Sequence, residues 1–475
     1  MPLNRSFRKK ATVILGIAFL LFLAIQFIRP SLANPPVTAD LSAPAPVKAI
    51  LKRACYDCHS NETRLAWFDQ PAPAYWLVVD HVKDGRKVLN FSNWDSLSKD
   101  GQTGKLFESL NQLEFGVMPI PQYAWFHHGA RISGDDITIL RQYLNTLAPI
   151  LKPDSTKQKA ADDQYGKWVI RPFTQTQVSL VPQPALNGLA YISGYDNWEA
   201  ISTSQRWDNG TMRVIFGNDV AVKAIRAGQT HPWPNGATFA KVAWDQLIDS
   251  VGEIRIGAFK QVEFMVRDND RYASTEGWGW GRWRGIDLAP YGKNAVFTTE
   301  CLNCHKPMQE NDHVFTIPTP DTLQLYDQAS SSRQSRSLPS GQPSSLPDSL
   351  AGHPLAGKVI SAFINTKDHT MSILYGNDTA VRSARTNAIY PPGAVLTLVT
   401  WSQRDDPHWY GARIPDTLRS VERIIFDSPS GVTSNPAYER YEGPSLKKST
   451  DIDPATVQRR TLYITGRKAA VLPGS

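Results

Sequence analysis

The sequence lacks the charge pattern of a nucleic-acid-binding protein. Its 475 residues carry a formal net charge of +7, but the basic residues are scattered and many have acidic neighbours, so no basic stripe forms beyond the extreme N-terminus. Apolar residues, in contrast, are plentiful. They make up 41% of the chain, which excludes disorder of the whole chain. A chain of this length predicts about three domains with cores of their own.

One long apolar run stands out near the start of the chain. Residues 11–28, ATVILGIAFLLFLAIQFI, contain no charged side chain. The run is long for a signal peptide and close to the minimum for a membrane span, and Ala33 ends a candidate cleavage site. We therefore expect residues 1–34 to be a membrane anchor or a signal peptide. The rest of the chain is expected in the periplasm, either anchored to the inner membrane or released by cleavage. The basic residues before the run are Arg5, Arg8, Lys9 and Lys10.

Cysteine is scarce: the four cysteines form two pairs, each followed directly by histidine, in CYDCH and CLNCH. Two thiols three residues apart can bond both vinyl groups of a porphyrin, while the adjacent imidazole binds the iron. A zinc site would not need a histidine after both pairs, and a thioredoxin-like disulfide would not normally occur twice without a βαβ pattern. The sequence therefore predicts two covalently attached haem c groups, with a structural disulfide in either pair as the alternative. The predicted attachment residues are Cys55, Cys58, Cys301 and Cys304, and the predicted iron ligands are His59 and His305.

Residues 45–150 are predicted to form a small helical haem domain. One apolar helical face leads into the first haem motif, and a later helix is predicted to begin at Ser133, which suits an N-cap. The second iron ligand is predicted to be Met118, in GVMPIPQY, because a methionine in a proline-flanked loop commonly binds opposite histidine. Met118 could instead belong to the core. The competing ligands are His81, His127 and His128. The two predicted apolar faces are Val47, Ile50, Leu51 and Ala54, and Ile137, Leu140 and Leu144.

Residues 165–320 favour a mainly antiparallel sheet with a few helices. The strand-like segments GTMRVIFGN, GATFAKVAW and FKQVEFMVRD outnumber the helical ones, of which DVAVKAIRAG is the clearest. Lys241, in the middle of the second of these segments, is either an ordinary solvent-facing strand residue or a group held there for chemistry. Three tryptophans in GWGWGRW, before the second haem motif, could wall a haem pocket or belong to the core.

The chain then repeats itself. Residues 329–349 are rich in serine and proline and predict a flexible linker. After it, TMSILYGNDTAVRSARTN, GAVLTLVTWSQ and SVERIIFD echo TMRVIFGNDVAVKAIRAG, GATFAKVAWDQ and QVEFMVRD in the same order, which indicates a tandem duplication. The repeat, residues 350–450, contains no cysteine and so cannot hold a c-type haem, and residues 451–475 are left as a tail. At the positions of Lys241 and Glu263 the repeat has Leu398 and Glu422.

Two resemblances follow from these motifs. Residues 45–148, with CYDCHSNETRLAWFDQ and MPIPQY, resemble a periplasmic haem-binding domain, which implies c-type haem binding and electron transfer. Residues 168–318, with YDNWEAISTSQRWDNG, WPNGATFAK, KQVEFMVRD and CLNCHKPMQENDHVFT, resemble the cytochrome P-460 family, as residues 355–445 do more weakly. That family implies an antiparallel-sheet fold that pairs into dimers, a five-coordinate c-type haem and, in its enzymes, hydroxylamine oxidation. The predicted fold class is therefore α+β: a small all-α haem domain followed by two tandem P-460-like domains, the second without haem.

The resemblance to the cytochrome P-460 family also implies roles for two residues. Lys241 falls on the lysine that bonds to the porphyrin rim, which the leucine of the cysteine-free repeat supports. Glu263 falls on the distal carboxylate that handles protons beside the bound substrate. Glu263 could instead be a salt-bridged strand residue, paired with Arg213 or Lys260.

These expectations combine into one functional hypothesis. The chain is predicted to be an exported multihaem cytochrome that oxidises hydroxylamine or a related small nitrogen species at the haem of His305. Electrons would pass to the haem of His59 and then to a periplasmic acceptor. The alternatives are a nitric-oxide-binding cytochrome of the c-prime-beta type and a plain dihaem electron-transfer protein, while a dihaem peroxidase shares only the two haem motifs. The haem-free repeat is expected to take the partner's place in an intramolecular pseudo-dimer.

Overall fold

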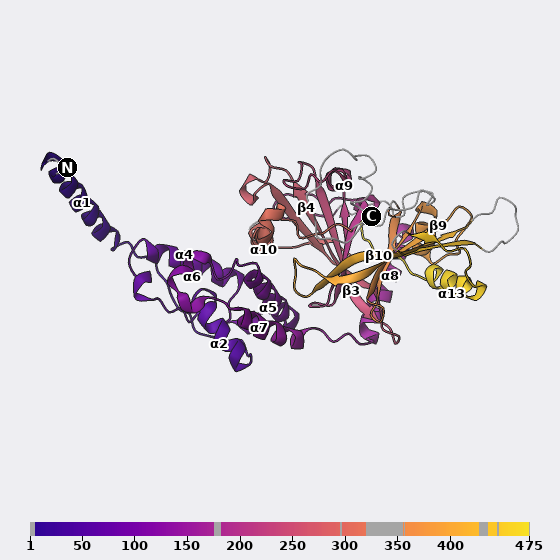
Figure 1. Cartoon of the computed structure of the whole chain (residues 1–475), viewed down its shortest axis with the longest axis horizontal. Coiled ribbons are helices and arrows are strands. Elements are labelled where there is room, and N and C mark those ends of the chain that lie inside the picture. Colours follow the sequence, from indigo (N-terminus) through magenta and orange to yellow (C-terminus); the bar gives the residue numbers. More distant parts are fainter. Residues whose placement is uncertain are drawn as a thin grey trace. The chain divides into compact units, whose positions relative to one another are not determined.

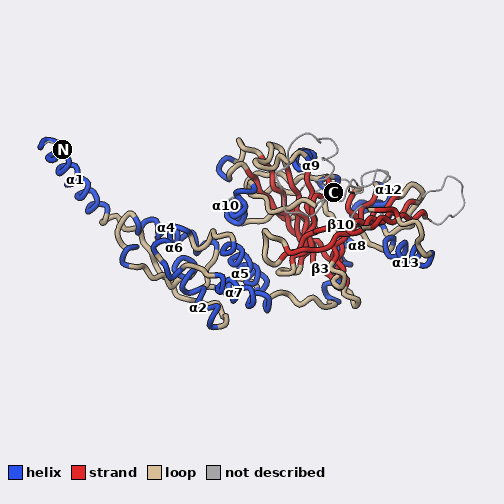
Figure 2. The backbone as a smooth tube through the Cα atoms, viewed as in Figure 1, coloured by secondary structure: helices blue, strands red, loops and turns tan. Residues whose placement is uncertain are grey.

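The chain divides into two compact units in the computed structural model, Met1–Ala148 and Pro149–Ser475. The first unit is helical and the second is built on β-strands, in agreement with the predicted α+β class (Figures 1 and 2). The predicted linker, residues 329–349, lies outside the described residues. The structure describes residues 5–174, 182–294, 297–319, 355, 357–426, 436–443 and 446–474.

Short helices make up the first unit, and its local signals behave as expected. The predicted cap at Ser133 is confirmed, because its hydroxyl accepts a hydrogen bond from the backbone N–H of Asp136. Of the predicted apolar faces, five of the seven residues are buried, while Ala54 and Ile137 are half-buried. The helices are α1 (Arg5–Ile25), α2 (Ala45–Ala54), α3 (Tyr56–His59), η1 (Trp67–Asp69), α4 (Ala74–Val88), η2 (Trp94–Ser96), α5 (Lys99–Glu114), α6 (Pro121–Phe126), η3 (His128–Ala130) and α7 (Gly134–Leu147).

The N-terminal helix α1 leaves its large apolar side chains exposed. Large aliphatic and aromatic side chains from Val13 to Leu23 are exposed by 43–69%. In the described part of the chain, no helix is long and apolar enough to cross a membrane.

The second unit contains the predicted sheet and its duplication. Strands form where branched and aromatic residues alternate between two covered faces, and the three predicted strand segments are β2, β3 and β4. The strands are β1 (Glu199–Arg206), β2 (Thr211–Gly217), β3 (Thr238–Ile248), β4 (Glu253–Arg267), β5 (Trp278–Arg284), β6 (Ala289–Pro290), β7 (Lys358–Asn365), β8 (Thr370–Gly376), β9 (Val395–Asp405), β10 (Ala412–Ile425), β11 (Ala437–Glu442) and β12 (Lys447–Lys448). The helices are α8 (Ser155–Thr174), η4 (Tyr195–Asn197), α9 (Asp219–Arg226), η5 (Ala273–Thr275), α10 (Phe297–His305), η6 (Lys306–Asn311), α12 (Asp378–Thr386) and α13 (Pro454–Thr465).

The strands β1–β6 form the first repeat and β7–β12 the second, and the two repeats have matching connections. In each, four antiparallel strands follow one another, and the fourth also pairs with the fifth through its C-terminal half. The N-terminal end of β4 pairs with β7, and the N-terminal end of β10 pairs with β1. The described strands thus form one sheet that returns on itself through two equivalent junctions.

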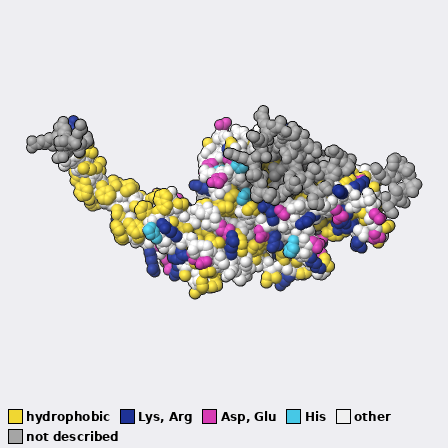
Figure 3. Space-filling view, viewed as in Figure 1, with side chains coloured by type: hydrophobic (Ala, Val, Ile, Leu, Met, Phe, Trp, Pro, Cys, Tyr) yellow, Lys and Arg dark blue, Asp and Glu magenta, His cyan; other side chains and the backbone are white. Residues whose placement is uncertain are grey.

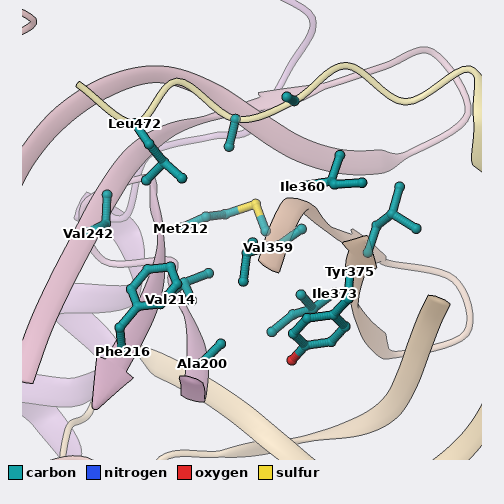
Figure 4. Packing of buried hydrophobic residues seen from close by; sticks show 14 of the residues in the cluster. Ala200, Met212, Val214, Phe216, Val242, Val359, Ile360, Ile373, Tyr375 and Leu472 are labelled. Atoms are coloured by element: carbon teal, nitrogen blue, oxygen red, sulfur yellow. The ribbon is translucent and has the colours of Figure 1, made fainter. Parts of the chain in front are cut away.

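A shared hydrophobic core fills the space between the repeats. Met212, Val214 and Val242 of the first repeat belong to the same buried cluster as Val359 and Tyr375 of the second (Figure 4). Burial of these side chains stabilises both repeats at once, because each supplies the apolar surface that covers the other.

Residues 451–475, predicted only as a tail, are part of this core. The stretch from Ala469 to Leu472 is buried, and the backbone N–H of Ala470 donates to the carbonyl of Ile360. Two buried indoles, those of Trp168 and Trp244, donate to the carbonyls of Leu472 and Val471. The C-terminal stretch therefore joins β3, β7 and α8.

Candidate haem sites

The first haem motif lies on α3, where His59 is held by the end of α4. The Nδ1–H of His59 donates to the carbonyl oxygens of Gly85 (3.0 Å) and Leu89 (3.1 Å), which leaves Nε2 for a metal. Burial lowers the pKa of His59, so the ring stays neutral, as a ligand must. A Cβ on Gly85 would lie 2.7 Å from the carbonyl oxygen of Cys58, so glycine is required for this close approach.

The candidates for the second iron ligand at the first haem motif differ in how available their ligand atoms are. Met118 is half-buried in the loop between α5 and α6, and its binding to the iron stays a prediction. His127 competes poorly, because its Nδ1 lies 3.1 Å from the carbonyl oxygen of Tyr123 and its Nε2 lies 3.0 Å from Asp69 Oδ2. His128 is exposed.

All four cysteines are half-buried, and neither pair forms a disulfide. Burial raises the pKa of Cys55, Cys58 and Cys301 to about 12. These sulfurs are therefore neutral thiols, which is compatible with attachment to vinyl groups.

The second haem motif ends α10 at His305. The Nδ1–H of His305 donates to the carbonyl oxygen of His313 (2.7 Å), so Nε2 is again free for a metal. The rings of Trp280 and Phe315 lie 5.8 and 5.1 Å from the His305 ring. Burial, with a smaller contribution from the charge of Lys241, lowers the pKa of His305 to about 4. Both motifs therefore present a neutral imidazole fixed by backbone carbonyls.

Lys241 and Glu263 face each other across β3 and β4. They are directly opposite in the strand register, and Nζ of Lys241 lies 2.6 Å from Oε2 of Glu263. Oε1 of Glu263 lies 3.1 Å from Nε of Arg282, on β5, and accepts a hydrogen bond from Gln261. Of the predicted salt-bridge partners, Lys260 instead pairs with an aspartate, Asp245.

The charged groups of this cluster alter one another's pKa values, and they also act on the second haem motif. Although burial opposes ionisation, the positive charges of Arg282 and Lys241 hold the pKa of Glu263 well below its usual value. Burial lowers the pKa of Lys241, and it lowers that of Arg213 to about 9. Because Lys241 and Glu263 also influence the pKa of His305, the pair lies within electrostatic reach of the second haem motif.

The residues around His305 fit a haem. In the described part of the chain, the buried Nε1 of Trp280 and Nε of Arg213 have no hydrogen-bond partner. Buried polar groups are almost always paired, so the orphaned indole N–H beside His305 fits a polar ligand, as a haem propionate would supply. Cys301, Cys304 and His305 would hold this haem, and Ile215, Phe239 and Met265 belong to the apolar cluster against which Cys301 packs.

The second repeat contributes directly to this site. The loop between β9 and β10, residues 406–411, reaches the segment that follows α10. There the Nδ1–H of His408 donates to the carbonyl oxygen of Phe315 (2.7 Å), and the ring of Trp409 lies 5.8 Å from that of Phe315. Trp409 is held in turn by Asp208, whose carboxylate accepts from its indole (3.2 Å). Phe315 is thus fixed between His305 and the second repeat.

The matching position in the second repeat is filled by protein. Leu398 and Glu422 are opposite each other in the strand register, as Lys241 and Glu263 are. Glu422 accepts two hydrogen bonds from Arg460 of α13 (2.6 and 2.8 Å) and one from Tyr438 (2.5 Å). Its side chain is only 3% exposed.

Two histidine-bearing haem motifs of this geometry define a haem-binding protein with an α-helical unit and a β-rich unit. Residues 20–146 match the family described as haem-binding domain, and residues 192–316 and 356–457 match cytochrome P460. The chain is therefore a haem-binding domain fused to cytochrome P460 sequence that spans both repeats. No curated protein matches it.

Some partners of the site residues give little or no signal in the sequence. Gln261 and Arg282 bind Glu263, and period-two alternation on β4 could have identified Gln261, which lies two residues from it on the same face. Arg460 gives no signal, because α13 has no counterpart among the repeated motifs. Of the three predicted tryptophans, Trp280 lies beside His305, whereas Trp278 and Trp283 are fully buried in the hydrophobic clusters.

Proposed function

We propose that the chain is an exported c-type cytochrome that oxidises hydroxylamine or a related small nitrogen species at the haem of His305. Cys301 and Cys304 would attach that haem, and a second haem attached at Cys55 and Cys58 would accept the electrons before a periplasmic acceptor does. The observation that carries the proposal is the Lys241–Glu263 pair, 2.6 Å apart on the sheet face within electrostatic reach of His305.

The haem would supply an open iron position and take up electrons from the substrate. The chain's own residues then have separate tasks. The carbonyl of His313 orients His305, and Phe315 keeps the ring in place. Oxidising hydroxylamine also releases protons, which a nearby carboxylate can accept, and Glu263 is the carboxylate that the cluster provides.

Lys241 controls whether Glu263 can accept a proton. With Lys241 as an ammonium, Glu263 forms ion pairs with Lys241 and Arg282 and accepts a hydrogen bond from Gln261. Its pKa is then strongly lowered, so it is a weak base. A Lys241 nitrogen bonded to the porphyrin would lose its full positive charge. The pKa of Glu263 would then rise towards its ordinary range. The two predicted roles thus depend on each other.

Mass spectrometry of the haem peptide tests this arrangement. The peptide that contains His305 should carry the peptide of Lys241 with it, and a Lys241→Leu variant should lose that mass. Mixing the protein with hydroxylamine in a single turnover should reduce the haem of His59 after that of His305. If the haem of His59 is never reduced, the relay fails.

A second candidate is nitric oxide capture without turnover. It is favoured by the apolar side chains Ile215, Phe239 and Met265, which lie in the cluster beside Cys301. Stable nitric oxide binding, together with no reduction of either haem by hydroxylamine, would select this function.

The second repeat is proposed to be haem-free and to act as an internal partner. The β4–β7 and β10–β1 junctions give each repeat the same edge-to-edge contact with the other, as an isologous dimer would have. Deleting residues 350–475 should expose the shared core and cause dimerisation or aggregation. A well-behaved monomer would contradict this proposal.

A further inference from the structure

The haem domain carries an exposed apolar surface beside the end of α1. Three of its members are highly exposed: Phe27 by 89%, Trp67 by 82% and Phe126 by 70%. We call this surface the aromatic patch. It consists of Phe27, Ile28, Trp67, Leu77, Trp125 and Phe126. In the space-filling view, apolar side chains cover α1 and continue onto the adjoining part of the haem domain (Figure 3).

Hydrogen bonds fix the segment after α1 to the haem domain. The side chain of Gln26 forms two hydrogen bonds with the backbone of Ala72, at 2.8 and 3.1 Å. The indole N–H of Trp76 donates to the carbonyl of Ile28 at 2.6 Å. These bonds tie Phe27 and Ile28 to the start of α4, so the exposed side chains belong to a defined surface.

Aromatic contacts join the remaining part of the patch. The ring of Phe68 lies 5.6 Å from Trp67 and 6.4 Å from Phe126, so η1 and α6 adjoin. The patch is also connected to the first haem motif, because the hydroxyl of Tyr123, on α6, donates to Asp57 of CYDCH at 2.7 Å.

The chemistry of the patch identifies its partner. Monomeric proteins seldom expose several large apolar side chains together unless another surface covers them. Tryptophan and phenylalanine next to an apolar helix, with a cation at the rim, are typical of proteins that lie in the headgroup region of a membrane. Arg29 provides that cation, exposed and stacked on Tyr75 at 4.2 Å. The apolar run of α1 leads directly into the patch, so one surface can cover both.

We propose that the aromatic patch rests in the interfacial layer of a phospholipid bilayer. The haem domain then lies against the membrane on the side of η1, α4 and α6. The first haem is thereby held at a fixed distance from the membrane surface. This contact is separate from any contact of α1 with the bilayer. It also does not depend on the substrate oxidised in the second unit.

Photochemical labelling of the full haem-loaded chain tests the proposal. p-Benzoylphenylalanine replaces Trp67 or Phe126, and the protein is mixed with vesicles of phosphatidylethanolamine and phosphatidylglycerol. The matched control places the same group at Ile389, which is 94% exposed on the second unit. Illumination should give lipid adducts at positions 67 and 126 in several-fold excess over position 389, as measured by mass spectrometry.

Two results would overturn the proposal. One is the absence of lipid adducts at positions 67 and 126, and the other is cross-linking of these positions to a second copy of the chain. Folding is checked independently, because each labelled protein must retain the haem at Cys55 and Cys58. Loss of hydroxylamine oxidation would bear on the proposed function alone, since these adducts do not depend on turnover.

Discussion

Glu263 of the first repeat and Glu422 of the second stand at matching positions on matching strands, opposite Lys241 and Leu398. In the first repeat, the glutamate forms ion pairs with Lys241 and Arg282 on the sheet. The second haem motif lies on the helix α10. In the second repeat, the helix at the corresponding place in the chain is α13, which follows β12 as α10 follows β6. There Arg460 of α13 reaches Glu422 directly.

The difference shows that one fold can pair the same buried glutamate in two ways. A glutamate on a buried sheet face must be paired, because an isolated buried charge is unfavourable. The first repeat pairs it with Lys241 and Arg282, which both lie on strands of the sheet. The second repeat pairs it with a side chain from the covering helix.

The largest expected effect comes from removing the attachment residues that distinguish the repeats. In a Cys301→Ser, Cys304→Ser variant, covalent haem should fall from two groups per chain to one, because only Cys55 and Cys58 remain. Intact-protein mass spectrometry measures this directly. Two retained haems would mean that the second motif is not an attachment site.

Arg460→Ala should destabilise the second unit by about 3 kcal/mol, because it leaves the buried Glu422 without its bidentate partner. Denaturant unfolding measures the change. Arg459→Ala is the matched control, since Arg459 is exposed on the same helix and bonds the hydroxyl of Thr456, so its effect should stay within about 0.5 kcal/mol. Equal effects of both variants would show that the pairing of Glu422 by Arg460 does not stabilise the second unit.

Glu263 should make stability depend on pH in the acid range. Its folded pKa lies below the ordinary 4.5, so the unfolded chain binds more protons than the folded one just below that pH. The stabilisation is therefore complete above pH 4.5 and is lost as the pH falls towards the folded pKa. Thermal unfolding of the haem-free protein should show this loss, and Glu263→Gln should flatten it. An unchanged profile would indicate that Glu263 is not held ionised.

Trp409→Leu should have the smallest effect, about 1 kcal/mol, because it removes the ring contact with Phe315 and the bond to Asp208. It should also shift the absorption spectrum of the haem of His305, since Phe315 packs on that imidazole. Trp409→Phe keeps the ring and should restore most of the spectrum. If the spectrum is the same in the unaltered protein and in both variants, Trp409 does not influence the haem of His305.

The sequence predicts the molecule best where the chemistry is local. The CxxCH spacing, the cap at Ser133 and the alternation on β3 depend on residues within a few positions of each other, so they could be predicted. Repetition extends this reach, because aligning the two copies is enough to match Leu398 with Lys241 and Glu422 with Glu263.

Long-range contacts could not be predicted, for a physical reason. Arg460 meets Glu422 across 38 residues, and the buried C-terminal stretch meets Trp168 across more than 300. Nothing in the local pattern of residues 451–475 distinguishes a core segment from a solvent-exposed one. The role of the loop at 406–411 gives no local signal either, because its contact with Phe315 exists only once the two repeats have closed the sheet.

The two junctions that close the sheet have a consequence for how the protein can change. In a homodimer every substitution appears twice, so a change that suits one site is imposed on the other. Two repeats on one chain are free of this constraint, so each half can carry its own substitutions. The aromatic loop at residues 406–411 and the shorter turn at residues 249–252 occupy equivalent places between matching strands, yet they differ. Because both repeats lie on one chain, this asymmetry needs neither a second gene nor a heterodimer.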